Sequence, residues 1–218
     1  MKTTLKLMTV LLAAWGILSL RQTAQTLGAL EQGIIRLHIL ADSDTIESQT
    51  NKLMVRDALL EASAGWFDGC ADADDCLAVL KQKLPQIERT ASETLRGTGS
   101  RDTVTAALET TAFPARKYGR ITLPAGRYRA LTVRIGRGEG QNWWCVMYPA
   151  LCLPAASGEA EPGLLAETLP EAVCDMAEAP ERYEIRLKCV DVCRSVADWI
   201  QRKFRGAEQD PAASPTDA

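Results

Sequence analysis

The sequence has little of what most enzymes need, because it holds a single histidine, His38, among 218 residues. No set of cysteines and histidines has the spacing of a zinc site, and the aspartates at 72–75 lack the glycine and distal glutamate of an EF-hand loop. No acid pair or phosphate-binding loop is present, and the alternating glycines at 136–140 do not follow the dinucleotide-binding spacing. We therefore expect no metal and no cofactor, and we expect the protein not to be an enzyme.

Neither sign of charge dominates the chain. It carries 25 Lys and Arg against 28 Asp and Glu, a net charge of −3 with a pI near 5.4. No overall field therefore attracts nucleic acid or an anionic membrane. A locally basic stretch from Arg116 to Arg137, which also contains Tyr118, is the exception. It is either a solvated face or a surface for an acidic or phosphate-bearing partner.

The cysteines number seven, so in an oxidising compartment at least one stays free or pairs with another chain. Structural cysteines are favoured over a metal site, since no zinc pattern is present. Cys145 and Cys152 could form a disulfide only if the chain reverses between them, because an extended segment would hold their Cα atoms beyond the roughly 7 Å limit. Pro149 is the one strong turn residue between them, so we predict that the two cysteines can form a bridge across it.

The N-terminal residues have the composition of an export signal. Lys2 and Lys6 precede an apolar run, Leu7–Leu20, that has no polar face. As a helix this run would span about 21 Å, less than the roughly 30 Å of bilayer hydrocarbon. Length and flanks favour an export signal at residues 1–22 over a stable span; no A-x-A cleavage site follows, so an uncleaved signal anchor is the alternative.

The first strand and helix follow this signal. Ile34–Leu40 alternates apolar and polar residues, as a strand with a buried face does. Asp44 and Glu47 have the spacing of a capping box and predict the start of a helix. Lys52 and Arg56 lie off the apolar stripe of that helix, so they are expected to be solvated unless a partner covers them.

Periodic apolar positions predict the next elements. A second helix should span residues 72–97, with Pro85 kinking or splitting it. Val104–Leu108 alternates as a strand. Near the C-terminus, Tyr183–Cys189 alternates as a last strand, and Val192–Phe204 has the spacing of a closing amphipathic helix.

The centre of the chain reads as a hairpin. Leu131–Ile135 alternates as a strand with one buried face, and the glycines at 136–140 indicate a chain reversal. Asn142–Tyr148 is apolar nearly throughout, which suits a strand covered on both faces. Because successive strand residues point to opposite faces, Trp143 and Trp144 should face opposite ways, one toward the core and the other toward a helix, a loop or a partner.

These elements predict an α+β fold: a mixed, mostly antiparallel sheet with amphipathic helices packed on one face. A single domain should occupy residues 30–205. Within it, residues 155–180 form an acidic insertion rich in Ala, Glu and Pro, and residues 206–218 a disordered polar tail.

The ordered pieces of sequence between Ile34 and Leu153 resemble a known family. They are IRLHILADSD, KLMVRDALL, FPARKYG and the run PAGRYRALTVRIGRGEGQNWWCVMYPALC. Together these pieces resemble the stage II sporulation protein R family of endospore-forming bacteria. No such match extends over residues 155–180.

The resemblance implies a signalling protein of sporulation. Members of the family are exported from the forespore into the space between the two septal membranes. There they trigger a membrane-bound aspartic protease of the mother cell, which matures pro-sigma-E. The candidate partner-binding residues are Asn142, Trp143, Trp144, Arg116, Tyr118, Lys52 and Arg56. Membrane contact would come from the N-terminal segment if it is not cleaved.

Two other functions stay open at this point. The first is an exported hydrolase with Cys145 as nucleophile and His38 as base, which is weakened because burial in an apolar strand raises a thiol pKa. The second is a carbohydrate or cell-wall binding module with Trp143 or Trp144 as a stacking platform, which requires an exposed aromatic face.

Overall fold

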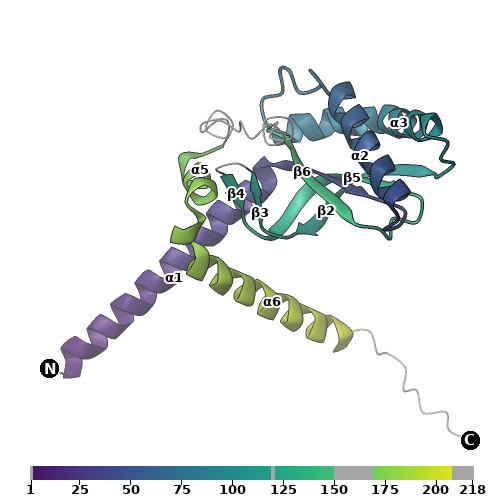
Figure 1. Cartoon of the computed structure of the whole chain (residues 1–218). Helices are drawn as coiled ribbons and strands as arrows, with labels where there is room; N and C mark the ends of the chain where they lie inside the picture. Colours follow the sequence, from purple (N-terminus) through teal and green to yellow (C-terminus); the bar gives the residue numbers. More distant parts are fainter. Residues whose placement is uncertain (1, 119–120, 150–168, 208–218) are drawn as a thin grey trace, which may run out of the picture. The chain divides into compact units, whose positions relative to one another are not determined.

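The computed structural model describes residues 2–118, 121–149 and 169–207 (Figure 1). The chain divides into two compact units: residues 27–180, and residues 1–26 together with 181–218. Each unit is considered by itself. The expected domain of residues 30–205 spans parts of both units and stays a prediction.

The first unit is built on a four-stranded mixed sheet of order β2-β5-β1-β6. Its strands are β1 (Ile35–Leu40), β2 (Val104–Phe113), β5 (Gly126–Ile135) and β6 (Asn142–Tyr148). The pairs β2–β5 and β1–β6 are antiparallel, and β1–β5 is parallel. With helices on one face, this is the predicted α+β architecture.

The predicted hairpin between β5 and β6 is wrong, because β1 lies between these two strands. All but the last residue of β1 is buried, as befits a central strand with both faces covered. β1 pairs with β5 on one side and with β6 on the other, so the turn that leaves Ile135 crosses the end of β1 before β6 returns.

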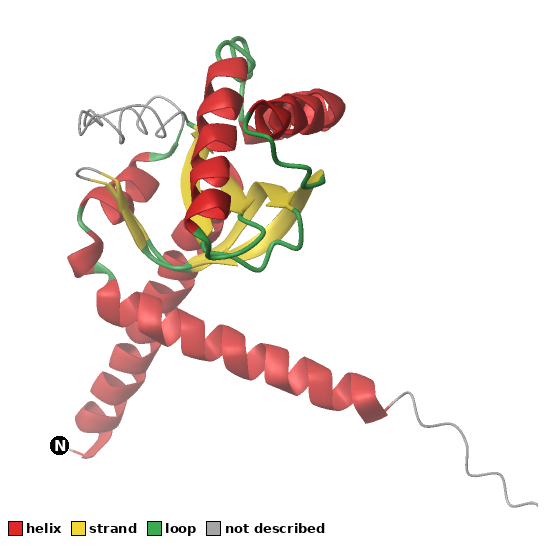
Figure 2. Cartoon of the chain, turned by 45° about the vertical axis from the view of Figure 1, so that its right-hand side comes forward, coloured by secondary structure: helices red, strands yellow, loops and turns green. Residues whose placement is uncertain are grey.

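Helices α2 (Ile46–Ala62) and α3 (Ala73–Gly97) cover one face of the sheet (Figure 2). Alternate strand residues, among them Leu37, Leu131 and Cys145, form one buried core with the inner sides of these helices. Asp72 caps α3 by accepting hydrogen bonds from the N–H groups of Asp74 and Asp75.

Three local predictions for these helices are corrected. The N-cap of α2 is Thr45, not Asp44, because the Asp44 carboxylate instead accepts from the backbone N–H of Gln141, 2.7 Å away. Pro85 does not split α3, which continues through it to Gly97. Lys52 is 5% exposed and therefore buried rather than solvated.

The opposite face of the sheet carries a second buried group. The strands β3 (Arg116–Tyr118) and β4 (Ile121–Leu123) pair antiparallel and place Tyr118 against Arg36 of β1. Helix α5 (Glu171–Glu178) contacts β4, followed by a 3₁₀ turn, η1 (Pro180–Arg182). The buried apolar residues on this side include Leu27, Leu30, Tyr118, Ile121, Leu123, Val173 and Met176.

The second unit holds most of α1 (Lys2–Gly33) and all of α6 (Glu184–Ala207). The predicted last strand, Tyr183–Cys189, is wrong, because all of it after Tyr183 belongs to the start of α6. Its apolar residues continue the helical spacing of Val192 and Val196. The predicted Leu7–Leu20 run lies inside α1, whose 32 residues make it long and apolar enough to cross a membrane.

Candidate partner-binding site

The turn between β5 and β6 is fixed to the loop that follows β1. The backbone N–H groups of Glu139 and Gly140 donate to the carbonyls of Asp42 and Ala41, at 3.2 and 2.9 Å. Gly140 lies so close to the Ser43 carbonyl that no Cβ could fit there. Two distant pieces of sequence, ADSD and GRGEG, therefore form one structure that positions the start of β6.

From this turn, β6 runs along the outer side of β1 and directs its two tryptophans to opposite faces. Trp143 packs against the core beneath α2, whereas Trp144 stacks on His38 on the other face. Both side chains are half-buried, and Asn142 before them is exposed. The candidate residues on the two faces thus form two separate clusters.

On the helix side, the Arg56 guanidinium lies over the Trp143 ring, 4.3 Å from its centroid. Arg56 Nη2 also lies 2.6 Å from Oδ1 of the exposed Asp57. The Trp143 indole N–H is buried and has no hydrogen-bond partner among the described residues. This Trp143–Arg56 pair combines a large aromatic side chain with a cation, which is the composition of a binding hot spot.

Lys52 supports this cluster from within. Its ammonium donates to the Gln49 side chain at 2.6 Å and to the Gln141 carbonyl at 2.9 Å. Burial lowers the pKa of Lys52, and the nearby Asp44 opposes that shift. Lys52 therefore holds the turn against α2, and this role leaves it little exposed to any partner.

On the opposite face, the His38 ring stacks on Trp144 with 3.9 Å between ring centroids, and Phe113 meets Trp144 edge-on at 4.6 Å. His38 Nε2 lies 2.7 Å from Asn142 Oδ1, so Nε2 is the protonated nitrogen. Burial lowers the pKa of His38, and the hydrogen bond to Asn142 opposes the shift. His38 is a neutral part of an aromatic stack.

Arg36, next to this stack, is the most unusual residue of the face. It is completely buried, and its guanidinium lies 4.1 Å from the Phe113 ring centroid and 5.0 Å from that of Tyr128. Nη2 donates to the Tyr118 hydroxyl at 2.6 Å, whereas Nε and Nη1 have no partner among the described residues. Burial lowers the pKa of Arg36 and raises that of Tyr118.

The structure separates the two residues of the hydrolase hypothesis. Cys145 pairs with Leu37 and belongs to the core beneath the helices, whereas His38 lies on the other face of the sheet. Cys145 is also disulfide-bonded, so it carries no thiol to act as a nucleophile. Its predicted partner, Cys152, lies outside the described residues, and the pairing with it stays a prediction.

The remaining candidates are spread over the fold. Arg116 is exposed on β3, while Tyr118 is buried against Arg36. Among the described residues, no group of three His, Cys, Asp or Glu side chains could hold a metal ion. Sequence reasoning missed Arg36, Phe113 and Gln141; the signal for Arg36 was its place beside His38 on the polar side of an otherwise apolar strand.

Comparison with known proteins agrees with the arrangement of these pieces. The family model described as stage II sporulation protein R (spore_II_R) matches residues 31–157. Stage II sporulation protein R of Bacillus subtilis (strain 168) is 37% identical over 127 residues, which cover 58% of this chain and 57% of the relative. The match therefore spans less than two thirds of the relative's length. No solved structure matches the chain significantly. The matched region holds β1, α2, α3 and the whole sheet through β6, and the chain belongs to the stage II sporulation protein R family.

Proposed function

We propose that this protein is an exported signal of sporulation that binds and activates a membrane-bound aspartic protease, which then matures pro-sigma-E. Family membership supports the sporulation role. The apolar helix α1, which has the character of a signal sequence or anchor, supports export into the space between forespore and mother cell.

The function is binding rather than catalysis. The two candidate catalytic side chains, Cys145 and His38, lie on opposite faces of the sheet, and a triad or dyad requires hydrogen-bond contact between nucleophile and base. The protein then acts through a surface, and the partner supplies the chemistry.

The main observation in support of a binding surface is the Trp143–Arg56 pair at the start of β6. Trp144 is held between His38 and Phe113 and serves the fold. Trp143 is instead only half-buried, and Arg56, which lies over its ring, pairs with the exposed Asp57. We assign the protease contact to the partly exposed Trp143 ring and to Arg56, with a carboxylate or carbonyl of the partner accepting from the guanidinium.

Co-expression with the protease and pro-sigma-E in a non-sporulating host tests the function, with precursor cleavage as the readout. Wild type should give cleavage, and so should His38→Gln, which keeps a hydrogen-bond donor toward Asn142. Loss of cleavage in His38→Gln at normal accumulation would favour a catalytic role. Deletion of residues 1–21 should abolish signalling, and normal signalling from inside the cell would disprove the export step.

A further inference from the structure

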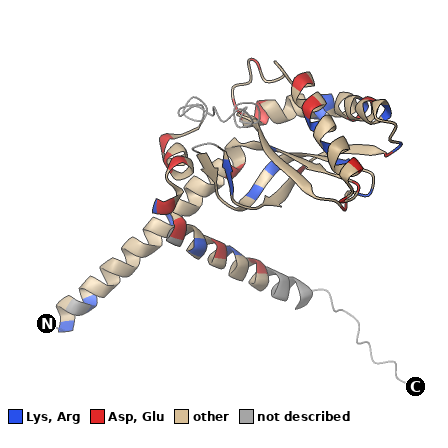
Figure 3. Cartoon of the chain, in the orientation of Figure 1, with Lys and Arg blue, Asp and Glu red and all other residues tan. Residues whose placement is uncertain are grey.

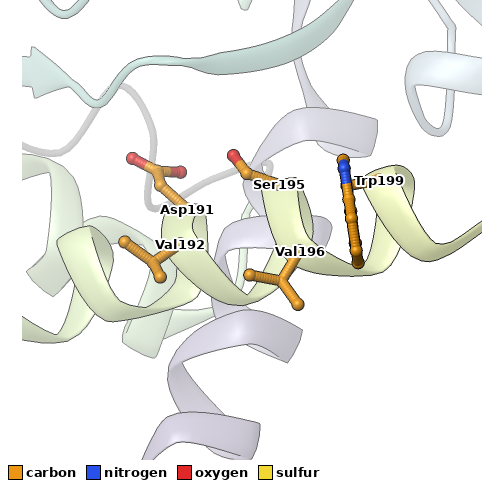
Figure 4. Close-up of a pocket in the computed structure, with 5 residues that line it drawn as sticks. All are labelled: Asp191, Val192, Ser195, Val196 and Trp199. Atoms are coloured by element: carbon orange, nitrogen blue, oxygen red, sulfur yellow. The ribbon is translucent and has the colours of Figure 1, made fainter.

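Helix α6 carries an apolar stripe that is largely exposed. Val192, Val196, Trp199 and Ile200 are 63%, 50%, 56% and 41% exposed. They recur at intervals of three and four residues, so they lie on one side of the helix. Val192, Val196 and Trp199 also line a shallow depression, with Asp191 and Ser195 on its polar side (Figure 4).

The charges of α6 differ from those of the chain as a whole. Residues 184–207 contain six Lys and Arg and three Asp and Glu, a net charge of +3, whereas the full chain carries −3. Figure 3 shows charged residues along the coloured part of α6, while α1 is mainly uncharged. An apolar stripe that includes Trp, on a helix with excess positive charge, is the composition of a helix that lies in a membrane interface.

Helix α1 favours a lipid bilayer as the partner of the exposed stripe on α6. Within the same unit, α1 exposes a long apolar surface, with Leu12, Trp15 and Ile17 each more than 60% exposed. Exposed apolar surface of this extent is unfavourable in water, and its length and hydropathy suit a membrane. A bilayer with anionic headgroups would remove the exposed apolar surface of both helices from water.

We propose that α6 is an interfacial helix, whose stripe of Val192, Val196, Trp199 and Ile200 inserts among the headgroups of anionic phospholipids in the membrane that α1 enters. The positive excess of the helix draws it to that surface, and the stripe supplies the apolar contact. This proposal does not depend on which protein the Trp143–Arg56 pair binds.

Two native thiols report on this contact. Cys189 and Cys193 are free and exposed, and they lie three residues before Val192 and Val196, respectively, so both border the stripe. The full chain is reconstituted in vesicles of phosphatidylcholine alone or mixed with phosphatidylglycerol. The rate of labelling of these thiols by a charged, membrane-impermeant maleimide is then measured by peptide mapping.

Labelling should be severalfold slower in vesicles that contain phosphatidylglycerol, and high salt should remove most of the difference. The double variant Val196→Asn, Trp199→Asn should label fast in both vesicles. Ser195→Asn, a neutral change on the polar side of the same turn, should behave like wild type. Circular dichroism confirms that each variant keeps its helix.

Equal labelling rates in the two vesicles, unaffected by the double variant, would overturn the proposal. Protection that is the same in both lipids and rises with protein density, with crosslinking between copies at Cys189, would overturn it in favour of a second copy of the chain.

Discussion

The two faces of the central sheet differ in the kinds of side chain that they bury. The face beneath α2 and α3 is mainly aliphatic, with Leu37, Ile39 and Leu131 in contact with helix residues such as Leu80 and Ile87. The opposite face holds a guanidinium, an imidazole and four aromatic rings within a few ångströms of one another. Both faces derive from alternate residues of the same strands. Neighbouring residues in the sequence are therefore stabilised by different interactions.

The two faces make different contributions to the fold, one to its stability and the other to the positions of neighbouring segments. Aliphatic side chains are stabilised by burial alone and tolerate many arrangements. A buried guanidinium without a carboxylate costs desolvation free energy and persists only where its hydrogen bond and ring contacts are held in place. We infer that the aliphatic face holds the fold together and that the polar–aromatic face fixes the position of β3 and of the start of β6.

The largest contrast should come from adjacent residues of β1. Leu37→Ala should lower the free energy of unfolding by about 2–5 kcal/mol, because it opens a cavity in a fully buried core. Arg36→Met should leave stability unchanged or raise it, since an apolar side chain of similar length removes the desolvation cost. Chemical denaturation of both variants measures this, and a greater loss in Arg36→Met would show that the ring contacts outweigh desolvation.

Tyr118→Phe should have the next largest effect. It removes the hydroxyl that accepts from Arg36 and leaves the buried guanidinium without its described partner. The cost should be about 1–3 kcal/mol of unfolding free energy. In the Arg36→Met background the same change should cost much less, and equal costs in both backgrounds would show that the two side chains are not coupled.

The pH dependence of stability should depend on His38. Because burial lowers its pKa below the ordinary 6.5, the unfolded chain binds a proton at a pH where the folded chain does not. Stability is therefore full above pH 6.5 and should decrease as the pH falls below it, by at most about 1.4 kcal/mol per pH unit. His38→Gln should flatten the profile between pH 5.5 and 7, and an unchanged slope would exclude His38 as its source.

The smallest effect on stability should come from Arg56→Ala. Its guanidinium stacks on Trp143 at the surface, and such a contact is worth about 0.5–1 kcal/mol. Thermal melting should change by only a few degrees. A large loss would mean that Arg56 serves the fold rather than a partner.

Local patterns predicted most of the elements but not their neighbours. The strands at Ile35–Leu40 and Asn142–Tyr148 follow from alternation and from apolar runs, and so does the α+β class. The order of the strands does not, because β1 enters between β5 and β6 through pairing that no short stretch encodes. In the same way, the alternation at Tyr183–Cys189 also satisfies a helix, and with no neighbouring strand the helix forms.

The candidate site was predicted in part for the same reason. The tryptophans on opposite faces follow from the two-residue period of a strand. The roles of Lys52 and Asp44 do not, because both are set by the Gln141 backbone, nearly a hundred residues away along the chain. Helical periodicity cannot predict that a lysine is buried because it binds a carbonyl far away in the sequence.

The most direct test of the proposed contact uses a double variant of this protein, Trp143→Phe with Arg56→Ala. The double variant is co-expressed with the protease and pro-sigma-E, and precursor cleavage is measured. This double variant keeps an aromatic ring against the core but removes part of the indole ring and the cation. The control, Lys81→Ala, changes an exposed residue of α3. We predict that the double variant melts within a few degrees of wild type and no longer supports cleavage, while the control supports it fully. Normal cleavage by the double variant would contradict the assignment of the contact to the start of β6.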